Sequence, residues 1–279
     1  RQVQRSEHPR VVVVTGGSSG FGKACVDHLA VRGHRVYGTS RGVEFPSPED
    51  SPTSPLLIPM DVREPASIEA ALAFILQREG RLDVLVNNAG IALAGAVEET
   101  SIDEARGLFD TNFFGVHRVC QSVLPIMRKQ GSGLIVNIGS IGGRISIPFQ
   151  GYYCASKHAL AALTDSLRME VKPFGIQVTL FEPGDFRTGL TANRVFAEGS
   201  RDACAYVDRQ NAAIAVMEKD EQGGPAPRQL ALLLERVIAK QRVRPRYLVG
   251  MLPQKLAVLA QSALPASLFE RLLMSYYRI

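Results

Sequence analysis

Short apolar runs recur along the chain, and each ends in a turn signal followed by a stretch with helical periodicity. Runs of this kind, rich in Val, Ile and Leu, predict β-strands that are buried on both faces. We expect strands at 11–17, 34–40, 56–61, 82–90, 133–140, 176–184 and 246–250, and helices at 21–32, 66–79, 101–130, 152–172 and 226–241.

Strands that alternate with helices predict right-handed βαβ crossovers. The expected fold class is α/β, a single Rossmann-type, doubly wound parallel sheet of about seven strands with helices on both faces. Because no repeat and no linker divides the chain, one catalytic domain is expected over 11–250. A flexible segment at 1–10 precedes it, and a helical extension at 251–279 follows it.

Composition narrows the class of protein. With 46% hydrophobic and 21% charged residues, the chain is typical of a globular protein. The formal charge is +5, but the basic residues are scattered, so no nucleic-acid surface is predicted. Cys25, Cys120, Cys154 and Cys204 lack metal-ligand spacing, which indicates reduced thiols, no metal and a cytoplasmic location. Neither a secretory signal nor a membrane-spanning helix is expected.

A glycine-rich turn, TGGSSGFG at 15–22, follows the first predicted strand and precedes a helix. Gly16 permits a sharp turn, Gly20 lets the backbone approach a pyrophosphate, and Gly22 lets the helix pack closely. The helix N-terminus offers unpaired N–H groups to phosphates. The spacing is G-x-x-x-G-x-G and differs from the general G-x-G-x-x-G. The turn predicts a dinucleotide site formed by Gly16, Ser18, Ser19, Gly20, Phe21 and Gly22.

The second predicted strand ends at Arg41, where an NAD site usually carries a carboxylate. A guanidinium binds a phosphate dianion in a forked geometry, which favours NADP(H) over NAD(H). The alternative is that Arg41 is one more solvated surface cation. Asp61 and Val62 are expected beside the adenine, although Asp61 could equally cap a turn or the next helix. Further along, the NNAG turn predicts Asn88, Ala89 and Gly90 beside the cofactor.

Two tyrosines precede a lysine in GYYCASKHAL, residues 151–160. Positions i and i+4 share a helix face, so Tyr153 faces Lys157 whereas Tyr152 pairs with Ser156. An ammonium group near a phenol is expected to lower its pKa from about 10, which suits acid/base chemistry near neutral pH. Taken alone, such a pair is more often a half-exposed aromatic side chain beside a solvated cation.

Two polar residues support a catalytic interpretation. Ser140 ends the fifth predicted strand, at the edge of a parallel sheet where ligands bind, and its hydroxyl can polarise a carbonyl. The alternative is a turn or N-cap serine. Asn112 lies inside 101–130, where asparagine is a mediocre helix former. It predicts a local kink that holds a water beside Lys157, or else an exposed or capping residue.

In order, TGGSSGFG, NNAG, Asn112, Ser140, Tyr153 with Lys157, and EPGDFRT resemble the classical short-chain dehydrogenase/reductase family over roughly residues 10 to 250. The resemblance implies NAD(P)-dependent hydride transfer, with Tyr153 as the acid/base. It implies that Lys157 lowers the pKa of this tyrosine and binds the nicotinamide ribose. Ser140 would orient the substrate, and Asn112 would complete a proton relay.

The same resemblance implies that Pro183, Gly184 and Thr188 line the nicotinamide side and that the chain forms a homodimer or homotetramer. SGFG and the late RPRYLVG look like the branch that contains retinol dehydrogenases, 17β-hydroxysteroid dehydrogenases and acyl-dihydroxyacetone-phosphate reductases. Many oxidases of that branch carry an acid where Arg41 stands, so this chain departs toward NADPH and reduction.

The segment after Thr188, over 188–228, breaks the βαβ rhythm and is interpreted as a substrate lid, or else as a helical surface excursion. Apolar residues flank the predicted catalytic groups and favour a lipophilic ketone or alcohol that is steroid-, retinoid- or lipid-like. The residues expected to contact substrate are Ile141, Ile145, Phe149, Phe186 and Leu190.

The tail at 252–279 has apolar residues at helical spacing, interrupted by Pro265. Most such helices dock on their own domain, but some lie on a membrane surface or cover a neighbouring subunit. Peripheral membrane contact is therefore one possible role of the extension.

These patterns together predict an NADP(H)-dependent oxidoreductase that acts on a carbonyl or secondary alcohol. One alternative is an NADPH-binding, redox-sensing regulator without turnover, which the complete set of catalytic residues disfavours. Another alternative, a sugar-nucleotide epimerase or dehydratase, would share the tyrosine and lysine. Such enzymes need a larger C-terminal substrate domain than this chain has room for.

Overall fold

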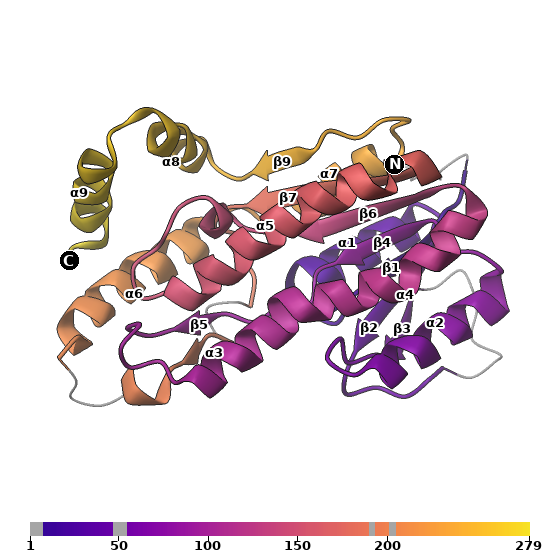
Figure 1. Ribbon diagram of the computed structural model, residues 1–279, viewed down its shortest axis with the longest axis horizontal. Helices are drawn as coiled ribbons and strands as arrows, with labels where there is room; N and C mark the ends of the chain where they lie inside the picture. Colours follow the sequence, from indigo (N-terminus) through magenta and orange to yellow (C-terminus); the bar gives the residue numbers. More distant parts are fainter. Residues whose placement is uncertain (1–7, 47–54, 190–192, 201–204) are drawn as a thin grey trace.

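The computed structural model describes residues 8–46, 55–189, 193–200 and 205–279, and a seven-stranded parallel sheet forms its centre (Figure 1). The strand order is β3-β2-β1-β4-β6-β7-β9. The order reverses direction between β1 and β4, which confirms the predicted doubly wound sheet and places the ligand-binding switch point there. The strands are β1 (Val11–Val14), β2 (Arg35–Ser40), β3 (Leu56–Pro59), β4 (Val84–Asn87), β6 (Gly133–Ile138), β7 (Ile176–Pro183) and β9 (Arg246–Val249).

Helices cover both faces of the sheet, as Figure 1 shows. One face packs against α2, α4 and α5, and the other packs against α1 and α7. In β1, Val11 and Val13 face the first layer while Val12 and Val14 face the second, which explains the uninterrupted apolar run. These helices are α1 (Gly20–Val31), α2 (Pro65–Glu79), α4 (Gly115–Gln130), α5 (Gly151–Val171) and α7 (Arg228–Ile238).

The predicted helix over 101–130 is three elements in the structure. It consists of α3 (Ile102–Phe109), a π-helical turn (Asp110–Phe114) and α4. The helix begins with a capping box, in which Ser101 accepts from the Glu104 backbone and the Glu104 carboxylate accepts from Ser101. The π turn confirms the kink expected around Asn112, because one extra residue per turn re-aims the side chains within it.

Two strands were not predicted. β5 (Leu93–Ala94) and β8 (Val195–Phe196) pair with each other in parallel, outside the main sheet. A two-residue strand carries no periodic signal, so sequence reasoning missed both. The predicted strands at 11–17 and 82–90 were also too long, because their last residues form turns.

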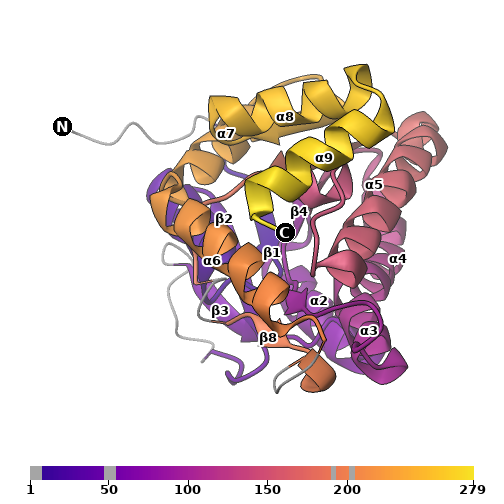
Figure 2. The ribbon, with the colours of Figure 1, turned by 90° about the vertical axis from the view of Figure 1, so that its left-hand side faces the viewer.

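The segment interpreted as a lid contains β8 and α6 (Val207–Gly223). The C-terminal extension forms α8 (Leu252–Ala263) and α9 (Ala266–Tyr277), with Pro265 as the N-cap of α9. Figure 2 looks onto one end of the sheet and shows α6, α8 and α9 around it. The segment interpreted as a lid and the C-terminal extension therefore meet at the same end of the molecule.

Two further features concern the described residues as a whole. None of their helices combines the length and the apolar content that crossing a bilayer would require. Cys25, Cys120 and Cys154 are free and buried, while Cys204 lies outside the described residues.

Candidate active site

The glycine turn between β1 and α1 leaves little room for side chains. Gly16 and Gly20 adopt positive φ angles of 65° and 52°, which glycine tolerates without strain. A Cβ atom on Gly17 would lie 2.5 Å from the Gly38 Cα atom in β2. A Cβ atom on Gly22 would overlap the Gly16 carbonyl oxygen. The turn is thus packed against β2 and against the start of α1, as the role predicted for Gly22 requires.

Asn88 connects this turn to the end of β4. Its Nδ2 atom donates to the Thr15 carbonyl at 2.9 Å and to the Gly16 carbonyl at 3.1 Å. The backbone N–H groups of Asn88 and Ala89 donate to Thr15 Oγ1 at 2.9 and 3.0 Å. Asn88 also lines a cavity, so it braces the turn and borders the site. Sequence reasoning missed Thr15, because one threonine at a strand end gives no signal of such a network.

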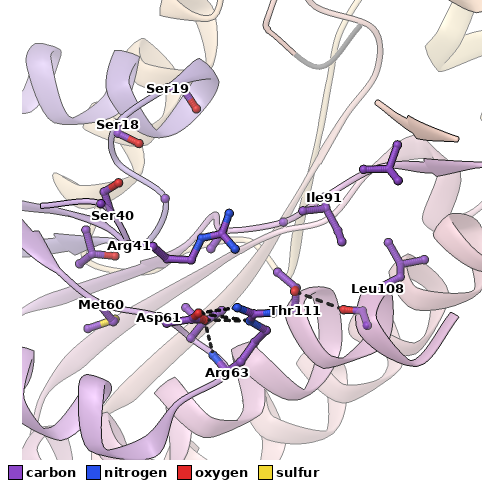
Figure 3. Close-up of a pocket in the computed structure, with 18 of the residues that line it drawn as sticks. Ser18, Ser19, Ser40, Arg41, Met60, Asp61, Arg63, Ile91, Leu108 and Thr111 are labelled. Carbon is purple, nitrogen blue, oxygen red and sulfur yellow. Dashed lines mark hydrogen bonds and ion pairs between the residues drawn. The ribbon is translucent and has the colours of Figure 1, made fainter. Parts of the chain in front are cut away.

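A cavity of about 570 Å³ opens beside the turn, at the ends of β2 and β3 (Figure 3). Figure 3 shows the Arg41 side chain extending into it, above Asp61 and Arg63. Eight of the residues predicted to bind cofactor line it, namely Gly16, Ser18, Ser19, Arg41, Asp61, Val62, Ala89 and Gly90. Thr39 and Arg63 also line it, and no sequence pattern pointed to either residue.

Asp61 lines this cavity and also closes a turn, while its place beside an adenine stays a prediction. It accepts from the Arg63 backbone N–H at 2.9 Å and so closes the turn before α2, whose N-cap is Glu64. It also forms a forked ion pair with the Arg63 guanidinium, with an Nη2–Oδ2 distance of 2.7 Å. This guanidinium holds the pKa of Asp61 below its usual range, and Arg41 acts in the same direction. Arg41 itself forms no ion pair with any residue that the structure describes.

The groups around this cavity fit an anionic dinucleotide. Thr39 is only 1% exposed, and its Oγ1 atom has no hydrogen-bond partner among the described residues. The glycine turn presents backbone rather than side chains, and Arg41 supplies a cation. Buried polar groups without partners are rare, so an unsatisfied hydroxyl on the wall of a cavity favours a ligand that would complete it.

A second cavity, of about 620 Å³, contains the predicted catalytic residues on α5 and in the turn that follows β6. Ser140, Tyr153 and Lys157 line it, whereas Tyr152 lines neither cavity. The predicted residues Gly20, Phe21, Pro183, Gly184 and Thr188 lie on its wall as well. The structure therefore brings three features to one place: the glycine turn, the segment from Pro183 to Thr188 (the P-G segment), and the pair of Tyr153 and Lys157.

Hydrogen bonds fix the positions of Ser140 and Lys157. Ser140 Oγ accepts from the Gly142 N–H at 3.0 Å, and hydrogen bonding from its hydroxyl acts to lower the pKa of the Tyr153 phenol. The serine is thus the N-cap of a short 3₁₀ turn and a neighbour of the phenol. Lys157 Nζ donates to the Ile138 carbonyl at 3.0 Å and lies 5.8 Å from the centre of the Tyr153 ring.

The expected effect of lysine on the tyrosine is wrong for the structure as it stands. Burial raises the pKa of Tyr153 to about 12, and the hydrogen bond with Ser140 opposes this only in part. Burial also lowers the pKa of Lys157 to about 8. Desolvation disfavours the charged form of both groups and is the largest cause of both shifts. The phenol is therefore protonated at neutral pH.

Asn112 is buried, 1% exposed, and holds the loop that follows β4. Its Oδ1 atom accepts from the Ile91 N–H at 2.9 Å, and its Nδ2 atom donates to the Ile91 carbonyl at 2.9 Å. A Cβ atom on Gly90 would lie 3.2 Å from Asn112 Oδ1 and 3.8 Å from Lys157 Nζ. Neither the exposed nor the capping alternative describes Asn112, and its role in a proton relay stays a prediction.

The P-G segment packs against the glycine turn. A Cβ atom on Gly20 would lie 3.8 Å from the Thr188 Cβ atom. The rings of Phe21 and Phe186 meet edge to face, with their centres 5.0 Å apart. This contact explains why a phenylalanine within the turn borders the second cavity.

The residues predicted to bind substrate have different positions. Ile141 and Phe186 line the second cavity. Ile145 is buried elsewhere, and Phe149 packs on a cluster that includes residues of α6 and α9. Neither of these two lines either cavity, although Ile147 and Gln150, which lie near them in the sequence, line the second. Leu190 lies outside the described residues.

Three carboxylates on the wall of the second cavity were not predicted. Asp185 follows β7, and Asp220 and Glu221 belong to α6. Burial, followed by the charges of Asp220 and Glu221, raises the pKa of Asp185 to about 6. Asp185 and Glu221 also raise the pKa of Tyr153, which shows that their charges reach the phenol. Sequence reasoning could not find them, because only the fold brings α6 to the end of β7.

Neighbouring side chains hold these carboxylates in place. Gln254 Nε2 donates to Asp185 at 2.6 Å, and the Tyr276 hydroxyl donates to Asp220 at 2.5 Å. Arg194 forms an ion pair with Glu221. The C-terminal extension therefore contributes directly to the wall of the cavity, where Tyr277 is a further lining residue.

Known proteins share this arrangement. The model of the short chain dehydrogenase family matches residues 10–198. The 3-ketodihydrosphingosine reductase of Bacteroides thetaiotaomicron is 40% identical over 271 residues, which cover 97% of this chain and 99% of the relative. Among solved structures, a short-chain dehydrogenase from Streptomyces avermitilis has a TM-score of 0.79 at 34% identity, covering 96% of this chain and 98% of that one.

A short chain dehydrogenase/reductase from Burkholderia phymatum, in complex with NAD, has a TM-score of 0.75 at 26% identity and covers 97% of this chain and 96% of that one. Sequence and fold agree across these comparisons. The chain belongs to the short-chain dehydrogenase/reductase family and is an oxidoreductase of that family.

Proposed function

We propose that the protein is an NADPH-dependent reductase of a lipophilic ketone that carries an amino group, in the class of 3-ketodihydrosphingosine. The observation that carries this proposal is the composition of the second cavity. There Ser140 and Tyr153 line the same cavity as the carboxylates of Asp185, Asp220 and Glu221, and Asp185 and Glu221 act on the pKa of the Tyr153 phenol.

The first cavity supports the choice of NADPH. Arg41, which has no ion pair among the described residues, and the Arg63 guanidinium can both approach a ribose 2′-phosphate. No carboxylate ends β2, where one would bind a 2′-hydroxyl group and repel a phosphate. The Burkholderia relative is in complex with NAD, so cofactor preference requires its own test.

The protonation states support reduction. The bound nicotinamide would supply a hydride to the carbonyl carbon of the substrate. Ser140 would donate a hydrogen bond to the carbonyl oxygen and polarise it. Tyr153, protonated at neutral pH, would transfer its proton to that oxygen as negative charge develops there. The Lys157 ammonium, in the same cavity, would stabilise the resulting phenolate.

Asp185, Asp220 and Glu221, which together we call the acidic wall of the second cavity, support an amino ketone as the substrate. In 3-ketodihydrosphingosine the ammonium group is on the carbon next to the ketone, so binding the ketone at Tyr153 brings the cation near the carboxylates. Glu221 is paired with Arg194, but Asp185 and Asp220 still repel each other, and a bound cation would relieve that repulsion. The relative from Bacteroides, a 3-ketodihydrosphingosine reductase, aligns over nearly the whole chain.

NADPH oxidation, followed by absorbance, tests the proposal. The substrate pair is 3-ketodihydrosphingosine and its N-acetyl derivative, which has the same ketone and alkyl chain without the positive charge. We expect kcat/KM to be at least about tenfold higher for the amine, as one desolvated charge pair would give. Asp185→Asn should reduce this preference, whereas exchange of the distant, exposed Asp103 for Asn should not. Equal rates for the two ketones would contradict the amino-ketone class.

Tight NADPH binding without turnover on any ketone would instead favour the redox-sensing alternative. The homodimeric or homotetrameric state, the cytoplasmic location and the division into domains at 11–250 and 251–279 stay predictions. So does the description of 188–228 as a lid.

A further inference from the structure

The C-terminal helices expose an apolar surface. On α8 it consists of Leu252, Leu256 and Leu259, and on α9 of Leu268, Leu272 and Tyr276. The exposed fractions of these residues lie between 44% and 68%. We refer to these six residues as the leucine face, and large apolar side chains gathered in this way usually mark an interaction surface.

Spacing places these residues on one side of each helix. On α8 successive leucines are four and three residues apart, and on α9 successive members are four residues apart. Each set therefore spans less than about a quarter of the circumference of its helix. The opposite side packs on the protein, where Val258 is buried and Leu273 and Tyr277 join a hydrophobic cluster. Apart from the Tyr276 hydroxyl, which donates to Asp220, the leucine face is therefore not needed to attach the two helices.

Cations flank the leucine face. Lys255 and Arg271 each lie about 60° from the first leucine of their stripe, at one residue per roughly 100°. Glu270, the one acidic residue of the segment 251–279, lies on the far side of α9. An apolar stripe bordered by Lys and Arg is the pattern of helices that lie at a bilayer surface, where the cations reach lipid phosphates.

We propose that the leucine face binds the surface of a bilayer that contains anionic phospholipid. The charges favour a bilayer over a second copy of the chain. A two-fold contact through this face would bring Lys255 and Arg271 toward the same cations of the other copy, and like charges at an interface are unfavourable. Lipid phosphates would instead complement them.

The position of α8 and α9 connects this surface to the active site. Their inner sides contribute Gln254, which donates to Asp185, and Tyr277, which lines the second cavity. A bilayer on the outer side would lie about one helix diameter, roughly 10 Å, from that cavity. If the substrate is a lipophilic ketone, as the proposed function holds, it would enter from the bilayer. The binding itself does not depend on the substrate.

Sedimentation with vesicles tests the inference on the full chain, without cofactor or substrate. The probes are vesicles of phosphatidylcholine alone and vesicles with one third phosphatidylglycerol. We expect the protein to sediment with the anionic vesicles at least about tenfold more strongly, because each cation near the surface contributes about 1 kcal/mol. Leu256→Glu with Leu272→Glu should abolish sedimentation, and Lys255→Glu with Arg271→Glu should remove the preference for anionic lipid.

Val31→Glu is the matched control, because Val31 is an apolar residue with 59% exposure at the end of α1, outside the leucine face. It should bind vesicles as the unmodified chain does. Thermal unfolding of every variant shows whether it is folded. Failure of the unmodified chain to sediment with either vesicle would overturn the proposal, as would equal loss of binding in the Val31 variant. The proposal would also be overturned if a variant of the leucine face kept its vesicle binding but changed the oligomeric state, seen as the molar mass measured by light scattering.

Discussion

At the scale of single residues, Tyr152 and Tyr153 show how much depends on one step along a helix. Consecutive residues are about 100° apart around the axis, so two identical side chains point in different directions. Tyr153 meets Ser140 and the second cavity, while Tyr152 lines neither cavity. We therefore expect only the Tyr153 phenol to take part in catalysis.

We expect Tyr153→Phe to lower kcat at least about 100-fold, because general acid catalysis contributes 10²–10⁴-fold. NADPH affinity, measured by fluorescence titration, should change little, because only the hydroxyl is lost. Tyr152→Phe is the matched control and should retain nearly full kcat. An equal loss in both variants would mean that Tyr153 is not the acid.

Arg41 is expected to set the preference for NADPH over NADH. Arg41→Asp should lower the ratio of kcat/KM for NADPH to that for NADH at least about tenfold, because a charge-assisted pair with phosphate becomes a repulsion. Arg106→Asp, on the exposed surface of α3, controls for net charge. An unchanged ratio would show that Arg41 is a solvated surface cation.

At the scale of elements, the glycine turn is specified by close packing. At Gly17 and Gly22 other backbone occupies the space that a side chain would need. Gly22, next to the Gly16 carbonyl, is of this kind, whereas Gly107 in α3 has open space where its Cβ would be. The same residue type therefore has opposite consequences in two helices.

Gly22→Ala should destabilise the protein by several kcal/mol or prevent folding, because overpacking forces the backbone apart. Gly107→Ala should instead stabilise it by about 0.5–1 kcal/mol, because alanine loses less conformational entropy in a helix. Urea unfolding measures both. A Gly22 variant as stable as the unmodified chain would show that the turn can move aside.

At the scale of the whole molecule, three segments far apart in the sequence assemble the acidic wall. β7 leads to Asp185, α6 carries Asp220, and the C-terminal extension supplies Gln254 and Tyr276. Clustered carboxylates destabilise the folded protein once they are ionised. The presence of Asp185 and Asp220 in this cavity is therefore better explained by ligand binding than by folding.

The pKa of Asp185 makes this cost measurable. Its value of about 6 in the folded protein exceeds the ordinary value of 3.8, so the folded state holds the proton more tightly. The destabilising contribution is therefore absent below about pH 4, grows between pH 4 and 6, and is complete above pH 6. Asp185→Asn should raise Tm by roughly 2–4 °C at pH 7.5 and change it little at pH 4. A pH-independent effect would contradict this account.

The sequence by itself determined the strand and helix order, the glycine turn, and the pairing of Tyr153 with Lys157. These follow from periodicity and short-range spacing, because residues four apart on a helix meet wherever the helix is placed. The family resemblance depends on the same local motifs. Even the kink at Asn112 was signalled by one poor helix former.

Only the tertiary structure decided which long-range contacts surround those motifs. It buried Tyr153 so that its pKa rises rather than falls, and it gathered Asp185 and Asp220 on one wall. It also turned the leucines of α8 and α9 outward. Desolvation and the charge of distant segments depend on how elements pack, and neither quantity is encoded in the spacing of neighbouring residues.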